Sequence, residues 1–227
     1  MKLNALIPLL ALAALIQAPV SAGAADARCN DEKSAPSEIE KPKLFLDKSP
    51  VIVKYQLGRL SNDQLLLADR ETSHPKFIPL WEAILGRAGM AAKFRTEAAE
   101  ALAKLNKTDA PTELLAAIQR VPASQPTVLA DLAKLLVTQK PGDLKKSQTA
   151  LETLAGGDGP DAARQAAFAA LIGIQPADAV WTFAQSKPGA LGHLIAGIPL
   201  VPDGTKRASL AGKVLPLLAP ATDAATR

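Results

Sequence analysis

Short stretches of helix-forming residues, separated by proline or glycine, follow one another along most of the chain and constrain its fold more than any other feature. No window alternates apolar and polar residues with the period of two that strands require. Alanine (44 residues) and leucine (34 residues) make up about a third of the 227 positions, and both favour helix. We therefore expect an all-α fold. From residue 92 onward the expected helices cover 92–106, 110–120, 126–139, 143–155, 160–173, 176–186, 189–198 and 205–218.

Three shorter helices are expected ahead of this series. The first follows Ser49-Pro50, because serine caps free amide groups and proline at the first helical position loses no hydrogen bond. The second follows residues 61–64, which read Ser-Asn-Asp-Gln, the pattern of a capping box. The third covers 77–87, where apolar residues three and four apart share one face.

The chain also resembles itself at a fixed offset of 69 residues. Aspartates near the starts of some predicted helices recur at about half of that offset, and so do two prolines at the starts of other predicted helices. The repeating unit is therefore two helices in about 35 residues. Such a unit is typical of an α-solenoid, in which each helix pair buries its apolar side on its neighbours. A compact, irregular helical bundle with accidental self-similarity is the alternative. The matched residues are Arg95 with Arg164, Ala98 with Ala167, Ala101 with Ala170, Leu102 with Leu171, Leu105 with Ile174, Asp109 with Asp178 and Ala110 with Ala179.

These observations predict a short, right-handed solenoid of antiparallel helix pairs over residues 49–218, capped at both ends. Residues 219–227 are expected to be a disordered tail.

The amino-terminal residues 1–25 have the features of a cleavable signal peptide. Lys2 precedes an uncharged run whose apolar part, Ala5–Ile16, has 12 residues, whereas a bilayer-spanning helix needs roughly 20. Small residues place the cut after Ala22 or Ala25, and both sites remain open. An uncleaved anchor is the alternative, but Pro8 and the short apolar part disfavour it. The chain is therefore predicted to be periplasmic or secreted.

Residues 26–48 are rich in charge and proline and are predicted to form a disordered tether. The tether contains Cys29, the single cysteine, so no internal disulfide can form. Lipid attachment at Cys29 is disfavoured because Arg28 replaces the small residue that such sites need. Beyond the tether no apolar stretch reaches membrane-spanning length, so no stable membrane insertion is expected after signal cleavage.

Charge patterning does not favour a nucleic-acid partner. The formal net charge is +4, but the 26 basic and 22 acidic residues are interspersed along the chain. The basic doublets Lys145-Lys146 and Lys206-Arg207 stand alone and form no continuous stripe.

No constellation of residues predicts a reaction or a metal site. The histidines, His74 and His193, are interpreted as an exposed turn residue and a partly buried helix residue. The carboxylate pairs Asp69 with Glu71 and Glu97 with Glu100 are interpreted as solvated helix surfaces beside Arg70 and Lys104. We therefore expect no catalytic residue, no metal, no cofactor and no enzymatic activity.

Four side chains are candidates for partner contact, because they recur near the starts or faces of predicted helices. They are Trp81, Arg95, Arg164 and Trp181. For both tryptophans, packing in the core is favoured over partner contact.

The pattern R-x-x-A-x-x-A-L, which begins at Arg95 and again at Arg164, resembles that of HEAT-type repeats. The stretch Phe45–Asp109, 65 of 227 residues, is similar to a segment of secreted planctomycete-type HEAT-repeat proteins. Longer members of that group carry a c-type haem or cupredoxin-like domain. This chain lacks the CxxCH motif and has no cysteine in its predicted folded part, so the resemblance implies the helical scaffold without the redox module.

Two functions are consistent with these features. The first is an exported, non-catalytic helical-repeat scaffold that mediates protein-protein interaction in the periplasm. The second is an accessory protein, or truncated remnant, of a multidomain c-type cytochrome or cupredoxin electron-transfer protein. The sequence identifies neither the partner nor the oligomeric state.

Overall fold

The computed structural model describes residues 39–218. The predicted signal peptide (1–25), the first part of the predicted tether with Cys29, and the predicted tail (219–227) lie outside the described residues.

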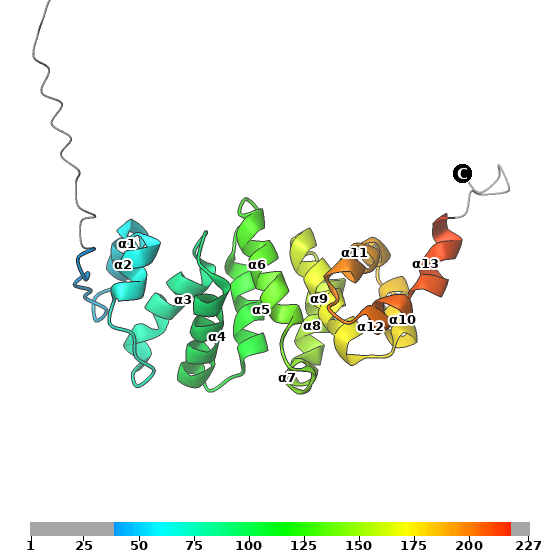
Figure 1. Cartoon of the computed structure of the whole chain (residues 1–227), viewed down its shortest axis with the longest axis horizontal. Coiled ribbons are helices and arrows are strands. Elements are labelled where there is room, and N and C mark those ends of the chain that lie inside the picture. The colour runs from blue at the N-terminus through cyan, green and yellow to red at the C-terminus, as the bar shows by residue number, and fades with distance from the viewer. Residues whose placement is uncertain (1–38, 219–227) are drawn as a thin grey trace, which may run out of the picture. The chain divides into compact units, whose positions relative to one another are not determined.

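Every regular element within residues 39–218 is a helix, which confirms the all-α prediction for this part of the chain (Figure 1). The 3-10 helices are η1 (Pro75–Phe77) and η2 (Ile198–Leu200). The α-helices are α1 (Pro50–Arg59), α2 (Asn62–Leu67), α3 (Ile78–Gly86), α4 (Ala92–Asn106), α5 (Ala110–Arg120), α6 (Pro126–Val137), α7 (Pro141–Lys146), α8 (Gln148–Gly156), α9 (Asp161–Ile174), α10 (Ala177–Gln185), α11 (Ala190–Gly197), α12 (Gly204–Ala208) and α13 (Ala211–Leu218).

Helix starts are fixed by local capping at several of the predicted positions. The Ser61 hydroxyl accepts from the Gln64 amide at 3.1 Å, and the Ser61 amide donates to Gln64 Oε1 at 3.0 Å, so the predicted capping box is present. Asp109 caps α5 by accepting from the Thr112 amide at 2.9 Å. The observed bounds of α4 and α5 coincide with the predicted ones.

Two of the predicted long helices are each divided in the structure. The helix expected over 143–155 is divided into α7 and α8 at Ser147, and the helix expected over 205–218 is divided into α12 and α13. The first break has a long-range cause. Ser147 is buried, with 6% of the residue exposed. Its hydroxyl donates a hydrogen bond at 3.3 Å to the carboxylate of Asp109, which lies 38 residues earlier in the chain. This contact holds the α7–α8 junction against the start of α5.

One apolar core runs through the described helices. Each of α3, α4 and α5 packs on the helix that follows it, and Figure 1 shows these elements side by side in chain order. Further along the chain α9 is central, because it packs against α6, α8 and α11. Its buried residues include five alanines, which let the neighbouring helices approach closely: Ala163, Ala166, Ala167, Ala169 and Ala170.

Arginine side chains satisfy backbone carbonyls at the carboxyl ends of neighbouring helices. Arg95, the fourth residue of α4, donates to the Leu85 carbonyl of α3, and Arg164, the fourth residue of α9, donates to the Ala155 carbonyl of α8 at 3.3 Å. Arg87 reaches the Leu57 carbonyl of α1 at 2.6 Å. The last carbonyls of a helix lack partners within it, so these contacts join neighbouring helices through polar groups as well as apolar ones.

The last residues of the predicted tether contact the helical unit. The Phe45 amide donates to Gln56 Oε1 of α1 at 3.1 Å, and Leu44 and Leu46 pack against the core. Residues 39–49 contain neither helix nor strand, but these contacts hold part of the segment against the helices.

Within the described residues, no helix combines the length and hydropathy needed to cross a bilayer.

Candidate binding cleft

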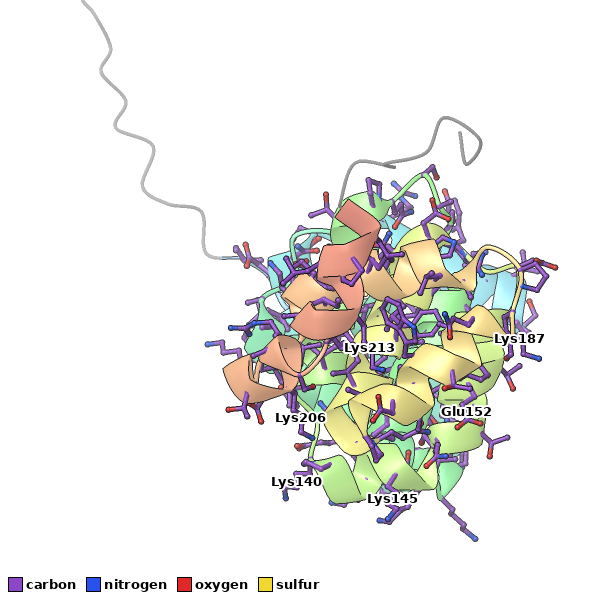
Figure 2. All side chains as sticks on the ribbon, turned by 90° about the vertical axis from the view of Figure 1, so that its right-hand side faces the viewer. Lys140, Lys145, Glu152, Lys187, Lys206 and Lys213 are labelled. Carbon is purple, nitrogen blue, oxygen red and sulfur yellow. The ribbon has the colours of Figure 1, made fainter. Side chains whose placement is uncertain are left out.

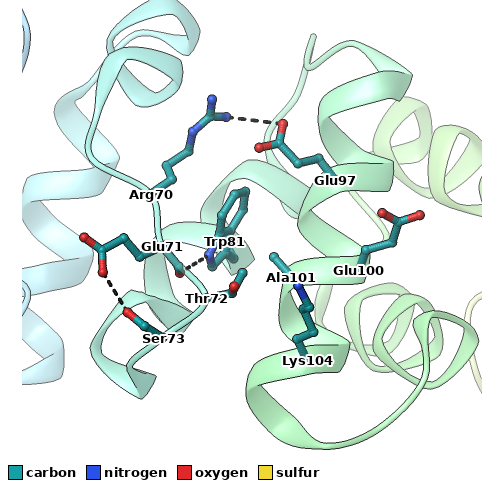
Figure 3. A pocket seen from close by; sticks show the side chains of 9 residues that line it. All are labelled: Arg70, Glu71, Thr72, Ser73, Trp81, Glu97, Glu100, Ala101 and Lys104. Atoms are coloured by element: carbon teal, nitrogen blue, oxygen red, sulfur yellow. Dashed lines mark hydrogen bonds and ion pairs between the residues drawn. The ribbon is translucent and has the colours of Figure 1, made fainter.

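An open cleft of about 720 Å³ lies where the connection between α2 and η1 faces α3 and α4 (Figure 3). Five of its nine lining residues are charged. The lining residues are Arg70, Glu71, Thr72, Ser73, Trp81, Glu97, Glu100, Ala101 and Lys104.

Trp81 forms the aromatic wall of the cleft. It belongs to α3, where the apolar spacing places it with Leu85 toward the core, and only 3% of the residue is exposed. Its indole Nε1 donates to the Glu71 carbonyl at 2.9 Å. This bond holds the α2–η1 connection against α3, and it satisfies the one polar atom of a buried indole.

Arg70 extends across the cleft from the α2–η1 connection. Its guanidinium lies 5.6 Å from the centroid of the Trp81 ring, within the range of a cation-π contact. Its Nη1 lies 3.6 Å from Glu97 Oε2 (Figure 3). That nitrogen is buried and has no hydrogen-bond partner among the described residues. The pair with Glu97 is therefore a charge contact without a hydrogen bond, in which Arg70 keeps unused donor capacity.

The opposite side of the cleft is formed by α4. Glu97, Glu100 and Lys104 lie three and four residues apart, so they share one helix face, and all three are exposed. Glu100 and Lys104 form no ion pair with any described residue, whereas Glu71 accepts a hydrogen bond from Ser73 Oγ at 2.7 Å. The cleft thus presents unpaired charges of both signs beside an aromatic wall.

This lining can bind charged and aromatic groups. The three carboxylates can hold a basic side chain, and Lys104 and Arg70 can hold an acidic one. Its nine residues include hydroxyl and carboxylate groups, with no imidazole or thiol among them.

The four predicted partner-contact residues do not form one site. Trp81 lines the cleft, but Arg95 is fully buried and Trp181, at 8% exposed, lies in α10 beneath the Lys213 ammonium group. Arg164 is half-buried in α9. As a surface contact, Arg95 needs correction, because it is buried and its guanidinium finds its partners within the fold. For Trp81 and Trp181 the core-packing interpretation is confirmed, since both are buried.

The interpretation of the charged residues also needs correction. Asp69 and Glu71 lie in the α2–η1 connection, not on a helix surface. Glu97 and Glu100 do lie on the surface of α4, as expected, but they face Arg70 and Trp81 across the cleft. This cleft was not predicted, because no local pattern in the sequence indicates that residues 70–73 lie against residues 97–104.

The buried Arg95 guanidinium has a shifted pKa. Desolvation lowers the pKa of the Arg95 guanidinium, and the nearby Asp131 carboxylate partly opposes this effect. The guanidinium donates to the carbonyls of Leu85, Arg87 and Met90. These bonds show that Arg95 has a structural role in holding α3 to α4.

The histidines lie apart, as expected. His74 is exposed, and its Nδ1 accepts from the Lys76 amide at 3.0 Å. The His193 side chain is 19% exposed on α11, with its Nε2 4.0 Å from the Asp161 carboxylate. Within residues 39–218, no group of three or more potential ligands from His, Cys, Asp and Glu is placed to hold a metal ion.

Comparison with known proteins finds no matching family model, no matching curated protein and no matching solved structure.

Proposed function

We propose that this chain is an exported, non-catalytic helical-repeat scaffold that binds a protein partner in the periplasm. Two features support a HEAT-like solenoid. From α3 to α6, and from α8 to α9, successive helices pack on one another. Arg95 and Arg164, which match in the repeat, occupy the same position in their helices. Each of these arginines also donates to the end of the preceding helix. Solenoids expose extended surfaces suited to protein partners.

The observation that carries the proposal is the composition of the cleft. Its volume of about 720 Å³ would also suit a small molecule, but small-molecule sites are lined mostly by apolar side chains. Here five of nine lining residues are charged, with both signs present and Trp81 between them. An extended polypeptide segment with a basic side chain near Glu97 and Glu100 and an acidic one near Lys104 is complementary to this lining.

Affinity capture tests the proposal. The mature chain, residues 26–227 with a carboxyl-terminal tag, is incubated with a periplasmic extract of the organism that carries it, over a range of salt. We expect one partner to be retained. Glu100→Lys should lower the captured amount at least about tenfold, because like charges at an interface are strongly unfavourable.

Asp158→Lys is the matched control. Asp158 is exposed in the turn between α8 and α9, so its variant has the same charge change away from the cleft and should capture the partner as the parent chain does. Absence of a partner at every salt concentration would contradict the scaffold function. A partner retained equally by both variants would contradict the use of the cleft.

A further inference from the structure

A second surface, at the first helix of the described unit, is apolar although it faces solvent. Along α1, Val53 and Leu57 are buried on one side. On the other side Val51 is 78% exposed, Tyr55 63% and Ile52 48%. Phe45, 47% exposed, lies in the segment that is bonded to α1 through Gln56. We name these four exposed side chains, Phe45, Val51, Ile52 and Tyr55, the α1 patch.

Cations surround the α1 patch. The Lys43 ammonium lies 5.6 Å from the centroid of the Phe45 ring, and the Arg59 guanidinium lies 5.5 Å from that of Tyr55 and donates to its hydroxyl at 3.1 Å. Residues 39–60 contain five basic and two acidic side chains. Two of the five bases pair with carboxylates, Lys41 with Asp69 and Lys48 with Asp47. The remaining three, Lys43, Lys54 and Arg59, are exposed and form no ion pair among the described residues.

We propose that the α1 patch docks the protein on an anionic phospholipid surface. Aromatic and aliphatic side chains ringed by Lys and Arg are the combination that binds at the boundary of headgroups and acyl chains. Each cation near such a surface adds electrostatic attraction to the burial of apolar groups. This surface is separate from the cleft, and its use does not depend on the proposed function.

The same charges argue against the other obvious occupant, a second copy of this chain. A two-fold contact centred on the α1 patch would bring the unpaired cations of one copy near those of the other. Like charges facing each other across an interface are unfavourable. Peripheral docking also requires no spanning segment, and no described helix could cross a bilayer.

Vesicle flotation tests the proposal with residues 26–227, which retain the whole compact unit that begins at Ile39. The vesicles contain phosphatidylcholine alone or with phosphatidylglycerol. We expect binding only to the phosphatidylglycerol vesicles, weakened by salt. The variants Val51→Ser/Tyr55→Ser and Lys54→Gln/Arg59→Gln should each lower the partition coefficient about tenfold or more. All four positions are exposed, so the fold should tolerate these changes.

Matched controls lie away from α1, at α13 and at α7. Leu215→Ser/Leu217→Ser removes exposed apolar side chains from α13, and Lys140→Gln/Lys145→Gln removes two of the peripheral cations that Figure 2 labels. Both should bind vesicles as the parent chain does. A direct readout of contact comes from Tyr55→Trp, whose added fluorescence should be quenched by brominated lipid while the buried Trp81 and Trp181 are not.

Three results would overturn the proposal. These are no binding to phosphatidylglycerol vesicles, binding that both α1 variants retain, and a salt-resistant dimer that the α1 variants abolish. The last would assign the patch to a second copy of the chain. None of these results bears on partner capture through the cleft, so the two proposals can fail separately.

Discussion

The Arg95 guanidinium on α4 lies 3.3 Å from the Asp131 carboxylate on α6, so an ion pair joins two helices that are not consecutive. The Arg95 side chain is 1% exposed and that of Asp131 is 37% exposed. Because the guanidinium also donates to three carbonyls near the end of α3, one side chain connects three helices.

We expect Arg95→Met to destabilise the fold by about 3 kcal/mol or more, because buried carbonyls and Asp131 lose their partner. Arg95→Lys should recover only part of this loss, since an ammonium cannot reproduce the planar fork of donors. Urea unfolding followed by circular dichroism measures both. Arg120→Met is the control, because Arg120 pairs with Glu82 at the surface and its loss should cost no more than about 1 kcal/mol. Equal losses in the Met variants would contradict the central role of Arg95.

Gly197 ends α11 where that helix approaches α9 most closely. A Cβ at this position would lie 2.5 Å from the Gln165 carbonyl oxygen, so we expect Gly197→Ala to lower the free energy of unfolding by about 1–3 kcal/mol. Gly192, in the same helix, has nothing within 4 Å of such an atom. Gly192→Ala should therefore raise stability by about 0.5–1 kcal/mol through helix propensity. Thermal unfolding of the two variants should give shifts of opposite sign, and shifts of the same sign would refute the α9–α11 packing.

Lys107 follows the last residue of α4 with φ of 57°, in the left-handed region. We expect Lys107→Gly to stabilise the protein by about 0.5–1 kcal/mol, because glycine adopts this conformation without a Cβ clash. Glu100→Gly, in the middle of the same helix, should instead destabilise it by about 1 kcal/mol. Chemical unfolding distinguishes the two. A loss of stability in the Lys107 variant would contradict this expectation, because the Lys107 side chain would then contribute more stabilising free energy than its backbone strain costs.

Asp143 and Lys146 form a 2.7 Å ion pair at the surface of α7. The hydrogen bond from Lys146 lowers the pKa of the Asp143 carboxyl, and the same bond raises the pKa of Lys146. The pair's contribution to stability is therefore present above the pKa of an unfolded aspartate and is lost as the pH falls through the lowered pKa. We expect Lys146→Gln to raise the pKa of Asp143 toward its usual value. Carbon-13 NMR titration of the carboxyl measures this, and an unchanged midpoint would show that the pair does not persist in solution.

Local signals in the sequence were sufficient for the helical class and for many boundaries. The Ser61 capping box acts within three residues, so the sequence alone predicts it. Asp109 was noted only as lying near a helix start, and in the structure it caps α5. The break at Ser147 was not predicted, because it depends on a hydrogen bond to Asp109, 38 residues away.

The candidate site could be predicted only in part, for the same physical reason. Trp81 was singled out, but the cleft depends on the bond from its indole to the Glu71 carbonyl, which draws the α2–η1 connection toward α4. Arg95 was a candidate for partner contact because it recurs near a predicted helix start. Its burial follows from the free carbonyls at the end of α3, and the matching Arg164 was the only sequence signal that pointed to this shared role.

Site-directed photocrosslinking tests the central claim, partner binding in the cleft, most directly. Cys29→Ser removes the single native thiol, so Glu100→Cys then carries one thiol-linked photocrosslinker at the cleft and Asp158→Cys carries one at the control turn. After irradiation in the periplasmic extract, we predict a covalent adduct with one partner protein from position 100 and none from position 158. No adduct from position 100, or equal adducts from both positions, would contradict the account.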